Sequence, residues 1–254
     1  MNAPKILFWD IETTHNVVAS FDLRDEYTPH TNILQERYVV CAAWSWLGDS
    51  KVHSVSVLDN PKLYAKDPHN DLHVIATLHK VLSEADVIVA HNGDAFDKKY
   101  VETRILFHGL PALPPIGSID TYKVAKARFR FNANRLDYLG KFLGFGGKIN
   151  TPPGLWLDVL KGVKSAINTM VVYNKRDVVL LKQIFGKLQP YIPNHISREL
   201  FGQVGCPRCG SAKVQSRGVH RAITKVYQRF QCQSCSGWFR KLRSEKETTD
   251  HRVL

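Results

Sequence analysis

The stretch Phe8-Trp9-Asp10-Ile11-Glu12-Thr13-Thr14 decides how this chain is interpreted. An apolar run that starts at Ile6 leads directly into two acidic residues with one isoleucine between them. Because side chains alternate along a strand, Asp10 and Glu12 should point to the same face. Neighbouring carboxylates at the end of a buried strand repel each other unless a cation lies between them. Hard divalent cations prefer carboxylate oxygens, so the pair predicts half of a metal site; a strand that ends in a polar turn is the alternative.

Apolar patterning along the rest of the chain predicts an α/β fold. Three strands are expected first, at Lys5–Glu12, Arg37–Leu47 and Val52–Leu58, and they form an antiparallel meander. Helices and strands then alternate, with helices at about 74–82, 95–107, 136–144 and 165–188 and strands at 87–90 and 116–121. Residues 13–36 and the Gly- and Pro-rich residues 144–164 show no clear period. This order predicts a mixed sheet with helices on both faces.

Two further aspartates follow the strand at 87–90, where open α/β sheets place their sites. Asp94 is positioned to cap the next helix by accepting the backbone N–H of Asp97. Asp97 then lies in the first helical turn, near the strand end. Gly93 indicates a close approach of backbone or ligand. Alternatively, both acids merely complement the helix dipole.

Another acid lies in the last long helix of this region. Tyr173 and Asp177 are four residues apart, so they share one helix face. Their neighbours are mostly apolar, and an aspartate buried among them needs a partner. A hydrogen bond to Tyr173, or an ion pair with Lys175 or Arg176, would supply that partner without a metal.

Three segments, taken in order, resemble the three motifs of the ribonuclease H-like (DnaQ-like) 3′→5′ exonucleases, a superfamily named for its four acids, Asp-Glu-Asp-Asp. They are Asp10-Ile11-Glu12, Asn92-Gly93-Asp94-Ala95-Phe96-Asp97 and Tyr173-Asn174-Lys175-Arg176-Asp177. The Tyr-x-x-x-Asp pattern is similar to the tyrosine subgroup, and Asn-x-x-x-Phe-Asp to the proofreading domain of B-family DNA polymerases. Asp120 and the helix at 136–144 resemble segments between the motifs. The resemblance covers about residues 4–190.

The resemblance implies a five-stranded sheet of order 3-2-1-4-5 and a site for two Mg²⁺ or Mn²⁺ ions. It implies that Asp10, Glu12 and Asp177 bind the ion that holds the attacking water. Asp10, with Asp97 acting directly or through a water, would hold the second ion, near the leaving 3′ oxygen. Tyr173 would orient or deprotonate the water. Two ions about 4 Å apart stabilise the attacking and leaving oxygens of an in-line displacement.

Substrate contacts are implied as well. Asn92 and Phe96 would meet the terminal nucleotide, although Phe96 could equally pack against Tyr100 in the core. Between the second and third motifs, basic residues alternate with Tyr122, Phe129 and Phe131, which is typical of a loop that contacts phosphates and stacks on bases. A solvated loop is the alternative. The basic residues are Lys123, Lys126, Arg128, Arg130 and Arg135.

The C-terminal region carries two Cys-x-x-Cys pairs. Cys206, Cys209, Cys232 and Cys235 have the spacing of a zinc ribbon, in which four thiolates bind one structural Zn²⁺ tetrahedrally. Strands are expected at 214–219 and 226–231, between the pairs. A redox dithiol is the alternative that two matched pairs argue against. His220 is expected on the surface, and Cys41 as a small buried apolar residue.

Charge is unevenly distributed along the chain. The net charge is +12, and residues 203–254 hold 11 Lys/Arg against 3 Asp/Glu. A basic tail beside a nearly balanced body favours a polyanionic partner, most simply nucleic acid. The predicted domains are a nuclease domain at 1–195, a linker at 196–204, a zinc ribbon at 205–243 and a disordered tail at 244–254. No signal peptide or membrane span is evident, so the cytoplasm is expected, of the host if the protein is viral.

The sequence therefore predicts a metal-dependent 3′→5′ exonuclease that favours DNA over RNA and single-stranded 3′ ends. A ribonuclease H-like transposase or resolvase is an alternative, but those enzymes arrange their acids differently. A non-catalytic nucleic-acid-binding protein is a second alternative, which the four acids and the tyrosine do not favour. The zinc ribbon is expected to engage either the substrate or a replication, repair or recombination protein.

Overall fold

The computed structural model describes residues 4–22, 28–193 and 204–243. They divide into two compact units, one of Lys5–Phe185 and one that joins the N-terminal residues before Lys5 to Gly186–Leu254. The predicted linker residues 196–203 and the predicted tail at 244–254 lie outside the described residues. Among the helices that are described, none has the length and apolar character needed to cross a bilayer.

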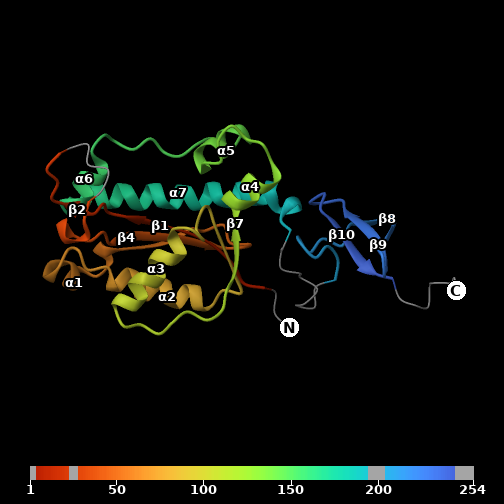
Figure 1. Ribbon diagram of the computed structural model, residues 1–254, viewed down its shortest axis with the longest axis horizontal. Helices are drawn as coiled ribbons and strands as arrows, with labels where there is room; N and C mark the ends of the chain where they lie inside the picture. Colours follow the sequence, from red (N-terminus) through yellow and green to blue (C-terminus); the bar gives the residue numbers. More distant parts are fainter. Residues whose placement is uncertain (1–3, 23–27, 194–203, 244–254) are drawn as a thin grey trace. The chain divides into compact units, whose positions relative to one another are not determined.

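The larger unit is built on a five-stranded sheet of order β5-β4-β1-β6-β7. Figure 1 labels three of these strands, β1, β4 and β7. β1 (Ile6–Thr13) is the central strand and is almost wholly buried at its apolar start. It pairs antiparallel with β4 (Val39–Trp46), which pairs antiparallel with β5 (His53–Ser56). On its other side β1 pairs parallel with β6 (Val87–Ala90), and β6 pairs parallel with β7 (Gly117–Asp120). In chain order of these five strands this is 3-2-1-4-5, so the predicted meander and sheet order are confirmed.

Helices cover both faces of the sheet. α2 (Leu72–Ser83) and α3 (Asp97–Phe107) lie on one face, and the long α7 (Lys164–Leu188) runs along the other (Figure 1). Because side chains alternate along β1, Trp9 is buried on one side, whereas Phe8 packs edge-on against Phe185 of α7 at 5.0 Å. Asp10 and Glu12 follow Phe8 by two and four positions in the strand, so their side chains point to the same face as Phe8, toward α7.

A buried ion pair holds the other face together. Asp71, immediately before α2, is fully buried and accepts a hydrogen bond from the backbone N–H of Val39 in β4. Arg104 of α3 donates to the same carboxylate through Nε and Nη2, at 2.8 and 2.7 Å. His108 Nε2 lies 2.6 Å from Asp71 Oδ1. One carboxylate thus ties two helices to one strand.

The structure adds short elements where no period was evident. β2 (Val17–Val18) and β3 (Ile33–Gln35) form a two-stranded ribbon within 13–36, and α1 (Pro61–Lys66) precedes α2. α6 (Leu155–Leu160) lies in the Gly- and Pro-rich region, and α5 (Leu136–Phe142) was expected. The predicted basic loop is partly wrong, because residues 121–128 form α4 (Thr121–Arg128). Asp120 caps this helix by accepting the N–H of Tyr122 at 2.9 Å, a strong local signal for a helix start.

The described part of the smaller unit contains a three-stranded antiparallel sheet of order β10-β9-β8. β8 (Val214–Arg221) and β9 (Val226–Cys232) match the two expected strands, and β10 (Trp238–Leu242) is an addition. The four tail cysteines gather in this unit, with Cys206 and Cys232 fully buried. Cys41, in contrast, lies in the core of β4, as predicted.

Candidate active site

Three carboxylates that are far apart in sequence converge beside β1. Asp10 and Glu12 come from β1, and Asp177 comes from α7; each offers an oxygen within 4.8 Å of the others. Because side chains alternate along a strand, Asp10 and Glu12 lie on the face of the sheet that α7 covers. Asp177 lies on the buried side of α7, opposite them. The sequence motifs at 10–12 and 173–177 therefore meet in space.

Asp97 joins this group through the backbone. It lies in the first turn of α3, is 5% exposed, and accepts the N–H of Ile11 through Oδ1 at 3.3 Å. Ile11 stands between Asp10 and Glu12, so all four predicted acids lie around the end of β1. The predicted cap by Asp94 is wrong: its carboxylate accepts instead from Ser118 Oγ and Lys123 Nζ, at 2.5 and 2.7 Å.

The backbone between β6 and α3 is tightly folded. Asn92 has a positive φ of 65°, and its N–H donates to Asp120 Oδ1 at 2.8 Å. A Cβ on the next residue, Gly93, would lie 2.3 Å from Ala90 Cβ, so only glycine fits. The close approach expected at Gly93 is thus made by the chain itself, and it sets the position from which Asp97 enters the site.

Lys148 is a site residue that sequence reasoning missed. Its Nζ lies 2.5 Å from Asp177 Oδ2 and donates to the Tyr173 hydroxyl at 3.0 Å. Burial lowers the pKa of this ammonium, but the attraction of Asp177 and the two hydrogen bonds outweigh burial, so the net shift is upward. The lysine thus brings a permanent positive charge into the acidic cluster.

A glycine-rich turn positions Lys148. Asp137 of α5 accepts the backbone N–H of Lys148 through Oδ1 at 2.8 Å. A Cβ on Gly147 would lie 2.3 Å from that same oxygen, so glycine is needed for the turn to reach it. Residues 144–150 carry no periodic pattern, which is why the sequence offered no signal for this contact beyond the clustered glycines.

Burial and mutual repulsion raise the pKa values of the clustered acids. Burial, followed by repulsion from the neighbouring carboxylates, raises the pKa of Asp10 well above its usual value. The same causes raise the pKa of Glu12 to about 8, against the attraction of Lys148. Burial also raises the pKa of Asp97 to about 6, and that of Asp177. Carboxyl groups in this state bind either protons or a cation.

The cluster fits a hard divalent cation. Asp177 Oδ1 is buried and has no hydrogen-bond partner among the described residues. The Asp10 carboxylate is held by Asn174 Nδ2, which donates to Oδ2 at 2.7 Å. A buried carboxylate oxygen without a partner, inside a group of three acids, offers the oxygen ligands that Mg²⁺ and Mn²⁺ prefer. Asn174, fully buried on α7, is a second residue that the motif alone did not single out.

Tyr173 lies beside the acids with its hydroxyl on Lys148. Its ring is contacted edge-on by Trp156 of α6, with centroids 6.1 Å apart. Burial raises the pKa of the phenol, against the hydrogen bond from Lys148. The hydroxyl therefore keeps its proton near neutral pH and serves as a hydrogen-bonding group.

A groove of about 730 Å³ opens next to Lys148. Asn92 and Arg135, two of the predicted substrate-binding residues, line it. His91, Tyr122 and Tyr138 add aromatic rings, so the groove offers both cations and stacking surfaces. The other lining residues are Ala133, Leu136 and Asp137.

The remaining predicted substrate residues lie elsewhere. Phe96 stacks on Tyr100 at 5.9 Å, as its packing alternative predicted. Lys126, Arg128 and Arg130 are exposed at and just beyond the last turn of α4, and they do not line the groove.

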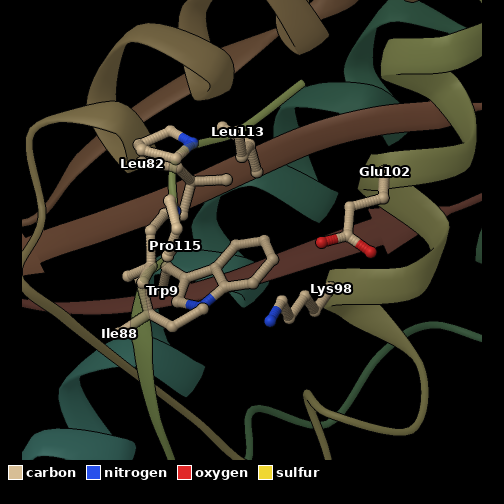
Figure 2. Close-up of a pocket in the computed structure, with 9 residues that line it drawn as sticks. Trp9, Leu82, Ile88, Lys98, Glu102, Leu113 and Pro115 are labelled. Carbon is tan, nitrogen blue, oxygen red and sulfur yellow. The ribbon is translucent and has the colours of Figure 1, made fainter.

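A separate cavity of about 400 Å³ lies at Trp9 (Figure 2). Lys98 and Glu102 of α3 line it on one side, with Leu82 and Leu113 among the apolar residues (Figure 2). Trp9 Nε1 is buried and has no hydrogen-bond partner among the described residues. Trp9 has the opposite strand parity to Asp10, so this cavity is distinct from the acidic cluster.

The tail cysteines form the second candidate metal centre. One sulfur from each of the four lies within 4.8 Å of the others, and Cys206 and Cys235 Sγ are 3.7 Å apart. Cys209 and Cys232 Sγ are 3.6 Å apart. Four free thiols gathered at these separations fit the four-sulfur shell that Zn²⁺ prefers.

Comparison with known proteins found one matching family model and similar solved structures. A family model described as the RNase_H superfamily matches residues 47–189. The chain is also similar to the family B DNA polymerase from the hyperthermophilic archaeon Pyrobaculum calidifontis, with a TM-score of 0.52 and 17% sequence identity over 75% of the chain. It spans about a quarter of that polymerase, 26% of its length. A comparison with curated proteins found no match.

Proposed function

Because this chain belongs to the RNase H superfamily, and so to a class of nucleases, we propose that it is a metal-dependent 3′→5′ exonuclease. The observation that carries the proposal is the convergence of Asp10, Glu12 and Asp177 within 4.8 Å. The matched family region starts after β1, at residue 47, so the position of the two β1 acids is an independent structural observation.

Asp10, Glu12 and Asp177 would hold one Mg²⁺ or Mn²⁺, and Asp10 with Asp97 would hold a second. Bound there, such ions lower the pKa of a water and stabilise charge on the attacking and leaving oxygens of a phosphodiester. Asn174 keeps the Asp10 carboxylate oriented through its 2.7 Å hydrogen bond. Asp97 is oriented in the same way by the Ile11 N–H.

Tyr173 positions the attacking water. The Tyr173 hydroxyl lies beside Asp177 through their shared partner Lys148, and Trp156 restrains its ring. The Tyr173 hydroxyl already takes part in a hydrogen bond with Lys148, so it is placed to accept or donate a hydrogen bond to the water. Of the two roles that the sequence left open, orientation is the one we propose.

The groove beside Lys148 would take the 3′ end of a single strand. Arg135 and Lys148 supply positive charge for phosphates, and Tyr122 and Tyr138 supply rings for unstacked bases. DNA is the proposed substrate, because the structurally similar protein is a DNA polymerase. We also propose that the C-terminal region is a zinc ribbon that binds one Zn²⁺.

The decisive experiment follows the digestion of labelled oligonucleotides on a gel. With Mg²⁺ or Mn²⁺, a 5′-labelled single-stranded DNA should yield a ladder that shortens from the 3′ end, and a 3′-labelled strand should release mononucleotide at once. RNA and duplex DNA should be degraded more slowly. Asp10→Asn with Glu12→Gln should abolish the activity, because two of the cation ligands lose their charge.

Asp94→Asn is the matched control. Asp94 lies only three residues before Asp97, but its carboxylate pairs with Lys123 instead of joining the cluster. The control should keep most of its activity. A mononucleotide released first from the 5′ end would overturn the proposed polarity, and full activity in the Asp10/Glu12 variant would overturn the proposed site.

A further inference from the structure

The two faces of the ribbon sheet in the smaller unit differ in chemistry. Pairing places Phe230 opposite Phe239, and their rings stack at 5.3 Å on one face, which we call the apolar face. Val214 and Val219 pair with β9 residues that lie an even number of positions from Phe230, so both valines lie on that face too. The opposite face carries basic and aromatic side chains. We call it the basic face; its residues are Gln215, His220, Tyr227, Arg229, Gln231, Trp238, Arg240 and Leu242.

Two arginines stand directly opposite each other on the basic face. Arg229 of β9 pairs with Arg240 of β10, and both side chains are exposed. Like charges at directly opposed positions destabilise a strand pair. Residues 204–243 hold nine Lys or Arg and no Asp or Glu, so no carboxylate of this segment offsets the repulsion. A bound polyanion would turn this unfavourable pair into a favourable one.

Aromatic side chains flank the arginine pair. The Arg240 guanidinium lies over the Tyr227 ring, 4.4 Å from its centroid. His220 pairs with Tyr227 across the strands, with ring centroids 6.2 Å apart. On the other side of the pair, Trp238 is 49% exposed although it is the largest side chain of the face. Burying this indole against a ligand ring would remove apolar surface from water.

We propose that the basic face binds single-stranded DNA, with phosphates between Arg229 and Arg240 and a base stacked on Trp238. Cations interleaved with exposed rings are the chemistry that single strands require. In a duplex the bases are already stacked on each other, so Trp238 would find no free ring face. The proposal rests on the proposed function only for the identity of the polyanion, and binding can be measured without any cleavage.

The test is the binding of fluorescein-labelled oligothymidylate to the full chain, followed by fluorescence anisotropy. All proteins carry Asp10→Asn, so that the strand stays intact; if the nuclease proposal is wrong, this change leaves the binding test unaffected. The key variant is Arg229→Gln with Arg240→Gln. Its Kd should rise about tenfold or more at low salt, and the slope of log Kd against log salt should fall by about 1.4, or 0.7 for each lost phosphate contact.

A matched control removes two charges from the apolar face. Arg221 pairs with Val226, and Lys241 pairs with Gln228, so both have the parity of Phe230. Arg221→Gln with Lys241→Gln should leave the Kd within about twofold, because only long-range attraction is lost. Trp238→Ala should raise the Kd about fivefold or more through the lost stacking. Zinc content, measured for every variant, shows whether the ribbon has kept its fold.

Several results would overturn the proposal. Equal weakening by the two double variants would mean that bulk charge, not the basic face, attracts the strand. No weakening by Arg229→Gln with Arg240→Gln in a zinc-loaded protein would leave a protein partner as the occupant. Oligouridylate displacing the DNA more efficiently than oligothymidylate would assign the face to RNA. Equal weakening toward blunt duplex DNA and single strands would exclude base stacking.

Discussion

At the scale of single residues, the site concentrates acidic groups around one partly buried lysine, Lys148. Glu12, Asp10 and Asp177 are brought within 4.8 Å of one another by their positions on β1 and α7. Burial and mutual repulsion raise the pKa values of all three, so keeping them ionised side by side is unfavourable in the absence of divalent cations. The cluster is therefore expected to destabilise the protein when no cation is bound to it.

The first prediction concerns pH and stability without added divalent cations. The pKa of Glu12 is about 8 in the folded chain and near 4.5 when unfolded, so between these values only the folded state keeps the proton. The free energy of unfolding should therefore fall as the pH rises from about 4.5 to 8. Thermal melts across this range should show a shallower fall in Glu12→Gln. Glu102→Gln, at an exposed position of α3, is the control. An unchanged pH dependence in Glu12→Gln would contradict the assignment.

The second prediction concerns Lys148. Its ammonium lies 2.5 Å from Asp177 Oδ2 and repels any cation that the acids bind. Lys148→Met should tighten Mn²⁺ binding on the order of tenfold, because two like unit charges about 4 Å apart repel each other by about 1 kcal/mol even in bulk water. Electron paramagnetic resonance of free Mn²⁺ measures this affinity directly.

Lys141→Met serves as its control. Lys141 is 64% exposed and pairs with Asp137 on α5, so it neutralises a carboxylate outside the cluster. Its loss should leave the Mn²⁺ affinity nearly unchanged. Weaker Mn²⁺ binding in Lys148→Met would show that the lysine organises the acids and does not compete for them.

At the scale of secondary-structure elements, Asp71 connects α2, α3 and β4. Its carboxylate is fully buried, and the Arg104 side chain is only 11% exposed. Removing one partner of such a pair leaves an uncompensated charge in the core. Because α3 begins with Asp97, this ion pair also fixes the helix that carries one of the site acids.

The third prediction follows from that buried pair. Asp71→Ala should lower the free energy of unfolding by about 3–5 kcal/mol, as measured by urea denaturation. The exposed pair Lys5–Glu84, at 3.1 Å, provides the comparison, and Glu84→Ala should cost no more than about 1 kcal/mol. Similar losses in the two variants would mean that Asp71 contributes no more than a surface charge.

At the scale of the whole molecule, the chain divides into units that depend on different forces. The larger unit, Lys5–Phe185, buries an extensive apolar core around β1 and β4. The ribbon in the smaller unit has no comparable core, since its described strands contain only one buried residue, Cys232. A unit with so few buried residues is therefore expected to need a bound metal in order to fold.

The fourth prediction tests this division. Cys206→Ser with Cys232→Ser should reduce the zinc content from about one ion per chain to near zero, because two of four ligands are lost. Limited proteolysis should then cleave within 204–243 while Lys5–Phe185 stays intact. Cys41→Ala, which changes a cysteine outside the cluster, should keep the zinc. A zinc-free double variant whose ribbon still resists protease would show that apolar packing suffices.

Local sequence patterns were sufficient to predict many features of this protein. The alternation around Asp10 and Glu12, the helical spacing of Tyr173 and Asp177, and the paired cysteines each depend on residues within a few positions of one another. Such patterns reflect the periods of strands and helices, so the elements, the initial meander and the four-cysteine cluster could be predicted. The sheet order and the grouping of the acids followed from the resemblance to the ribonuclease H-like exonucleases. The start of α4 at Asp120 carried a local capping signal that the basic composition obscured.

Tertiary structure alone decided the rest. Lys148 meets Asp177 across 29 residues, Asp71 meets Arg104 across 33, and Asn174 meets Asp10 across 164. No periodicity links such pairs, because their separation depends on how the loops between elements close and not on the geometry of one element. The sequence by itself determined which chemical groups this protein places at its strand ends. Only the folded chain brings the Lys148 ammonium among these acids, because a long-range contact exists only once the sheet and α7 have packed together.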